Sequence, residues 1–101
     1  MTKETRVKIK ILLNDIVYEA KVYCKDNKTK DIPLSKLNEF IDGYRIGSKA
    51  EETKEFITSC NDRLDRLATS STDICSITKN DTLSMSIIRV LVRGVKSSLK
   101  N

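Results

Sequence analysis

The segment from residue 6 to residue 13 alternates cationic and apolar positions, reading R-V-K-I-K-I-L-L. A period of two carried by β-branched side chains is typical of a strand that buries one face. We therefore expect a short N-terminal β-strand with an apolar face of odd-numbered residues and a largely cationic face of even-numbered ones. An ordinary solvated face would also account for the cations, so the neighbouring segments have to decide what this strand does.

The next apolar segment, residues 16 to 24, fits two structures. As a helix capped by Asn14, it has one face formed by Ile16, Ala20, Tyr23 and Cys24. As a strand, it has favourable β-branched and aromatic content, and a turn at Asn14-Asp15 would join it to the first strand as a hairpin. A two-residue hairpin loop usually has glycine at its second position, which Asp15 does not provide. We favour the helix and keep the hairpin as the alternative.

A short helix is predicted after the polar stretch at residues 26 to 31. Pro33 suits the first turn of a helix, and apolar residues recur at helical spacing after it. Gly43 and Gly47 indicate where this helix ends.

Two further helices are predicted in the second half of the chain. The longer one follows a Ser-Lys-Ala-Glu capping box and runs from about residue 49 to 70. We expect an ion pair one turn apart in it, between Asp62 and Arg66. Residues 69 to 72 are interpreted as a loop or a frayed end. An apolar stripe beginning at Leu83 predicts the last helix, although its β-branched residues also allow a strand. No internal repeat is visible.

The composition is that of a small basic domain. A chain of 101 residues supports one domain, or one domain with an appendage. Its 19 Lys and Arg against 14 Asp and Glu give a net charge of +5, concentrated in the first ten residues. A basic balance favours polyanionic partners. No apolar run approaches the ~20 residues of a membrane span, and the start lacks a secretory-signal pattern, so we expect no membrane association.

Several kinds of chemistry are disfavoured by residues that the chain lacks. It contains no histidine, the commonest general base and metal ligand, and its three glycines form no phosphate-binding loop. Cys24, Cys60 and Cys75 are an odd number at wide spacing, which suits neither a disulfide framework nor a zinc site. We expect buried thiols in a reducing cytoplasm, no cofactor, no metal and no enzymatic activity.

Residues 5 to 45 are thus expected to form a cationic strand, a helix, a polar turn and a second helix. This order resembles the ribbon-helix-helix family, the MetJ and Arc type of DNA-binding domain. In that family two chains pair their strands into an antiparallel ribbon that enters the major groove of DNA. This chain departs from the pattern in its β-branched first helix and in a polar turn without the customary glycine.

The resemblance implies two groups of DNA-binding residues. The ribbon would place side chains over the bases and near a phosphate, and the start of the second helix would bind a phosphate oxygen through its backbone N–H groups. The residues concerned are Arg6, Lys8, Lys10 and Leu12 on the ribbon, and Leu34, Ser35 and Lys36 on the helix.

The resemblance also implies a homodimer or higher oligomer, because a single strand has no partner within one protomer. The fold would be mainly α with a short N-terminal β-strand. Residues 1–46 would bind DNA and dimerise, and residues 47–101 would be a helical oligomerisation or docking region. Such an architecture resembles plasmid relaxosome accessory and mobilisation proteins, segregation adaptors and small transcriptional regulators. The implied partners are double-stranded DNA, the chain itself and, through residues 48–101, a relaxase, a segregation motor or another protein.

A different class of function follows if residues 16 to 24 form a second strand. The fold is then α+β, a β-hairpin packed on three helices, and the cationic face is solvent surface or a site for an acidic protein. Such a chain would be a protein-protein interaction module without DNA, such as a phage or plasmid inhibitor. General RNA binding is disfavoured, because aromatics make up 5% of the chain and no interleaving of basic and aromatic residues suggests base stacking.

Overall fold

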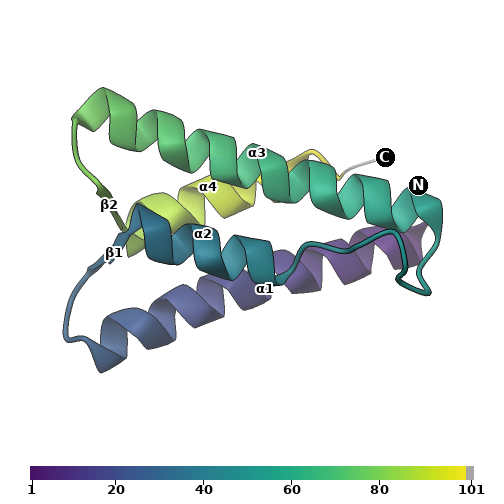
Figure 1. The fold of residues 1–101 in the computed structure, drawn as a ribbon, viewed down its shortest axis with the longest axis horizontal. Coiled ribbons are helices and arrows are strands. Elements are labelled where there is room, and N and C mark those ends of the chain that lie inside the picture. The colour runs from purple at the N-terminus through teal and green to yellow at the C-terminus, as the bar shows by residue number, and fades with distance from the viewer. Residues whose placement is uncertain (100–101) are drawn as a thin grey trace.

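The computed structural model describes residues 1 to 99, which are mainly helical (Figure 1). The elements are α1 (Lys3–Asp26), β1 (Asp31–Pro33), α2 (Leu34–Gly43), α3 (Lys54–Thr78), β2 (Thr82–Ser84) and α4 (Met85–Ser97). In Figure 1 the long helices α1 and α3 lie at the bottom and top, with α2 and α4 between them. The two strands meet at one end of the molecule, and the N-terminus lies at the other.

The chain is an internal repeat of two helix-strand-helix units, α1-β1-α2 and α3-β2-α4, whose equivalent residues are 51 positions apart. The N-caps Thr2 and Thr53 each accept a hydrogen bond from the backbone N–H three residues further on, at 3.1 and 3.2 Å. After each long helix the chain turns through a lysine with positive φ, 50° at Lys28 and 54° at Lys79. The expectation that the chain has no repeat is therefore wrong.

The two units are related by an approximate twofold axis that passes through the strand pair. β1 and β2 are antiparallel, and Ile32 lies opposite its own equivalent, Leu83. The hydrogen bonds that flank the strands obey the same symmetry. The N–H of Leu34 donates to the carbonyl of Asp81 at 2.8 Å, and the N–H of Met85 donates to the carbonyl of Lys30 at 3.1 Å. Each strand thus finds its partner within the same chain.

Helix α1 shows that the predicted N-terminal strand is wrong. The side chains buried along it are Thr5, Ile9, Leu13, Ile16, Ala20 and Cys24, a spacing of three and four that only a helix satisfies. Val7 and Ile11 lie on the opposite side and are 45% and 55% exposed. The alternation at residues 6 to 13 arises because α1 carries apolar residues on two opposite faces. The helix predicted over residues 16 to 24 is confirmed as part of α1, and the alternative hairpin is wrong.

The second half confirms part of the predicted pattern and shifts its boundaries. Helix α3 begins at Lys54 behind its N-cap Thr53, so the predicted capping box at residues 48 to 51 lies in the connection before it. The helix also runs through residues 69 to 72, where the sequence predicts a loop or frayed end. The ion pair between Asp62 and Arg66 is confirmed at 3.1 Å.

The two short helices are also close to their predicted positions. The short helix predicted after Pro33 is confirmed as α2, which ends at Gly43. The apolar stripe beginning at Leu83 contributes a three-residue strand and then α4. Local signals were sufficient here, because proline, serine and glycine stand at the helix ends.

One hydrophobic core joins the two units, because each short helix packs against both long helices. The core draws side chains both from residues 1–46 and from residues 47–101. Cys24, Cys60 and Cys75 are free and buried, as expected. Burial raises the pKa of the Cys60 thiol to about 11, which keeps it protonated and unreactive at neutral pH.

Candidate functional site

The four predicted DNA-binding residues of the N-terminal segment are dispersed around α1 rather than gathered on one face. The Lys8 ammonium lies 3.8 Å from Glu4 and 3.7 Å from Glu52, so it is neutralised on the side of α1 away from Lys10. Arg6 is half-buried and donates to the carbonyl of Met1. Leu12 packs against the core. The strand that would hold these residues in a ribbon is absent from this segment.

The three residues predicted on the second helix do lie at its start, at the strand end of the molecule. The N–H of Leu34 already donates to the carbonyl of Asp81, so it is not free for a phosphate. Lys36 pairs with Glu39 at 3.0 Å and lies over the ring of Phe40. Ser35 is exposed. These residues lie on α2, whereas Lys10 lies on the flank of α1 that packs against α4.

A cluster of cations that the sequence patterns did not reveal lies where α1 packs against α4. The seam between the helices is marked by Lys96, whose ammonium donates to the side-chain oxygen of Asn14 at 2.8 Å. On α1, Asn14 lies four residues after Lys10 and seven before Lys21, and Lys25 follows four residues later. On α4, Arg89, Arg93 and Lys96 follow one another at spacings of four and three. These spacings place the cations on one side of each helix. The resulting α1–α4 basic face consists of Lys10, Lys21, Lys25, Arg89, Arg93 and Lys96.

None of the six cations of the α1–α4 basic face forms an ion pair among residues 1 to 99, whereas several lysines and arginines on other surfaces do. Lys8, Lys36, Arg45, Arg63 and Arg66 each have a carboxylate partner. Helix α4 contains no acidic residue at all. Two of the six cations are half-buried and four are exposed. Like charges held together without counter-charges raise the local electrostatic potential and attract an anion with several charges.

The approximate twofold axis provides an equivalent surface on the other side of the molecule, where α2 packs against α3. This α2–α3 face has Asn61, Thr72 and Ser76 on α3 and Asn38, Asp42 and Arg45 on α2 in place of the six cations. Its single arginine is bound by Asp42 and Asp65, which raise its pKa further. The same backbone therefore presents one basic face and one face without excess positive charge.

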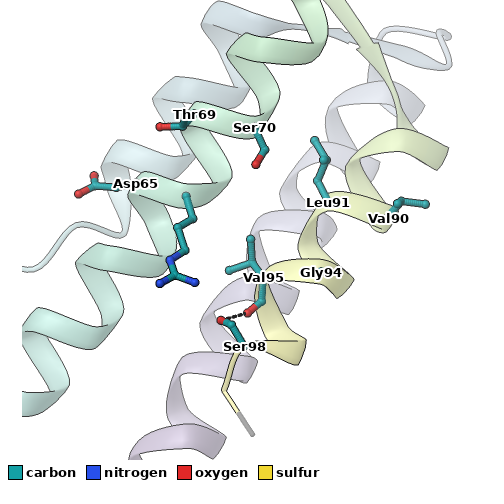
Figure 2. Close-up of a pocket in the computed structure, with 9 residues that line it drawn as sticks. Asp65, Thr69, Ser70, Val90, Leu91, Gly94, Val95 and Ser98 are labelled. Carbon is teal, nitrogen blue, oxygen red and sulfur yellow. Dashed lines mark hydrogen bonds between the residues drawn. The ribbon is translucent and has the colours of Figure 1, made fainter.

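The two grooves between the helices of each unit also differ. The groove between α3 and α4 has a volume of about 620 Å³ (Figure 2). On the α4 side it is lined by apolar residues such as Val90, Leu91 and Val95, and on the α3 side by polar and charged residues that include Asp65 and Arg66. In the other unit, the residue equivalent to Val95 is Tyr44. Burial and a hydrogen bond to Glu19 raise the pKa of the Tyr44 hydroxyl to about 12. The larger side chains of the first unit thus occupy space that the second unit leaves open.

No protein-family model, curated protein or solved structure matches the chain. The resemblance to ribbon-helix-helix proteins therefore stays a prediction. In residues 1 to 99, no helix is both long enough and apolar enough to cross a membrane. The same residues contain no group of three histidine, cysteine, aspartate or glutamate side chains placed to hold a metal ion.

A signal for the basic face was present in the sequence. Arg89, Arg93 and Lys96 recur at spacings of four and three in a segment without acidic residues. The first half offers Lys21 and Lys25 with the same spacing of four. What the sequence did not show is that α1 and α4 are neighbours, because these cations lie more than sixty positions apart along the chain.

Proposed function

We propose that the chain binds nucleic acid, with DNA as the first candidate, through the α1–α4 basic face. The observation that carries this proposal is the set of six cations that share one surface and have no carboxylate partner among the described residues. Each phosphate neutralised by such a cation releases condensed counterions, which supplies most of the affinity of basic surfaces for nucleic acid.

The geometry of the face suits a linear polyanion. Lys10 and Lys25 are fifteen residues apart on α1, so the row of cations is about 22 Å long at the rise of an α-helix. Arg89 and Arg93 lie one turn apart beside this row and add a second line of charge. Arginine offers several N–H donors in a fixed plane, which matches the oxygens of a phosphate.

This proposal keeps the DNA partner expected from the sequence and changes the element that binds it. A helical face takes the place of the β-ribbon, since residues 6 to 13 lie within α1. The short sheet that is present, β1 with β2, exposes Asp31 and no lysine or arginine within its strands. The homodimer, the sequence preference and the role as a plasmid accessory factor or regulator stay predictions.

The test is a binding titration of the double variant Arg89→Ala/Arg93→Ala at several salt concentrations. Binding is measured by the fluorescence anisotropy of labelled oligonucleotides, both single-stranded and duplex. The logarithm of the binding constant falls linearly with the logarithm of the salt concentration, and loss of two phosphate contacts should make this slope less steep by about 1.4 to 1.8. The matched control is Lys49→Ala/Lys54→Ala, which removes the same charge from exposed positions outside the face and without ion pairs in the described chain. Equal affinities and slopes for the two double variants would overturn the proposal.

A further inference from the structure

The α1–α4 basic face is bounded on one side by exposed apolar residues of α1. This α1 stripe consists of Val7, Ile11, Tyr18 and Val22, which are 45%, 55%, 66% and 37% exposed. Each of its residues lies three positions before Lys10, Asn14, Lys21 or Lys25, so the stripe runs beside the row of cations along the helix. Basic and apolar side chains are thus interleaved on this helix, with an aromatic ring at Tyr18.

The groove between α3 and α4 bounds the basic face on its other side. Val90, which is 60% exposed, lies on the ridge of α4 between Arg93 and this groove. A Cβ atom added at Gly94 would meet nothing within 4 Å, so the groove is open at its centre. Figure 2 shows Ser70 of α3 facing Leu91 of α4 across this space. The groove therefore combines an apolar wall on α4 with hydroxyl groups and two charged side chains, Asp65 and Arg66, on α3.

We infer that the nucleic acid bound by this face is single-stranded, an inference that rests on the proposed function. Phosphates would contact the six cations, and unpaired bases would contact the apolar surfaces on either side. Stacking of a base on an aromatic side chain contributes about 1–3 kcal/mol and does not depend on which base is present. A duplex keeps its bases stacked inside, so its binding would leave the α1 stripe and the groove unused.

Electrostatics alone predicts the opposite preference, which makes the inference testable. Duplex DNA has the higher charge density, and each phosphate contact with it releases more counterions, about 0.9 per contact against about 0.7 for a single strand. A surface that provides only charge therefore binds the duplex more tightly. Preference for the single strand requires contacts with the bases.

The experiment compares a labelled oligothymidine of about 16 nucleotides, the upper end of the site size of single-strand binding domains, with the same strand paired to oligoadenine. We expect the single strand to bind at least tenfold more tightly at equal salt. Tyr18→Ala should weaken single-strand binding about 5- to 150-fold, as loss of one stacked base predicts, and Tyr18→Phe should retain it. Ile77→Ala is the matched control, because Ile77 is 80% exposed and lies outside both apolar borders.

The groove is tested by Gly94→Leu, which places a side chain in the open space, with Gly43→Leu as the control at the equivalent position of the other unit. A Cβ atom at either position has no neighbour within 4 Å, so neither substitution creates a clash there. Only Gly94→Leu should weaken single-strand binding. One outcome would overturn this inference and leave the proposed function intact: the duplex binds as tightly as the single strand or more tightly, its binding depends on Arg89 and Arg93, and Tyr18→Ala does not change it. Absence of binding to either form would overturn both.

Discussion

The approximate twofold axis allows a gain of function to be predicted by transferring charge from one face to the other. Substituting Asn38→Arg, Asp42→Arg and Thr72→Lys gives the α2–α3 face cations at three positions equivalent to those of the basic face. Loss of Asp42 also removes one of the two carboxylates that bind Arg45, whose Nε donates to it at 2.9 Å, and leaves the ion pair with Asp65. The transferred face then has four cations beside two remaining carboxylates, Asp65 and Asp73, and it should bind a second oligonucleotide.

The magnitude follows from the number of phosphate contacts. Six contacts with a single strand give a slope of about −4 in log K against log salt, and four contacts give about −3. At about 50 mM salt, two missing phosphate contacts by themselves make the transferred site roughly 60-fold weaker than the native one, and the absence of the apolar borders weakens it further. The second site should therefore be visible at low salt and disappear first as the salt concentration rises.

The assay is sedimentation velocity with labelled oligonucleotide at saturating concentration, which measures how many oligonucleotides bind each chain. We expect one for the native protein and two for the triple variant. Circular dichroism checks that the variant is folded, which we expect because residues 38, 42 and 72 are exposed or half-buried. A folded triple variant that still binds a single oligonucleotide at low salt would show that the arrangement of cations is not sufficient for binding.

Three further predictions concern stability. Lys28→Gly and Lys79→Gly should each stabilise the fold by up to about 1 kcal/mol, because glycine tolerates positive φ, and a lower melting temperature in a thermal scan would contradict this. Leu64→Ala should lower the free energy of unfolding by about 3–5 kcal/mol in a denaturant titration, since Leu64 is fully buried, and a loss below 1 kcal/mol would argue against the core described. The pKa of Tyr44, about 12 against an ordinary value of 10, favours the neutral phenol in the folded state. The stabilisation from the neutral Tyr44 phenol is thus fully present below pH 10 and is lost as the pH rises toward 12. The free energy of unfolding of Tyr44→Phe, measured by denaturation across that pH range, should not show this loss.

Features that depend on local signals could be predicted from the amino-acid sequence alone. Pro33 and Gly43 mark the ends of α2, and the ion pair between Asp62 and Arg66 follows from their spacing within one helix. The burial of three free cysteines and the excess of positive charge also follow from composition. These features require no knowledge of which distant segments meet.

Features that depend on neighbours in space could be read only from the folded chain. Residues 6 to 13 alternate like a strand, and only packing shows that Ile9 and Leu13 face the core while Ile11 faces outward. The repeat was hidden because the two units share burial positions and caps rather than side-chain identities. The basic face exists only because α4 returns along α1, which brings together cations that are scattered in the sequence. Helix α1 by itself has cations beside its apolar stripe, but the groove between α3 and α4 needs two helices and is therefore a product of the fold.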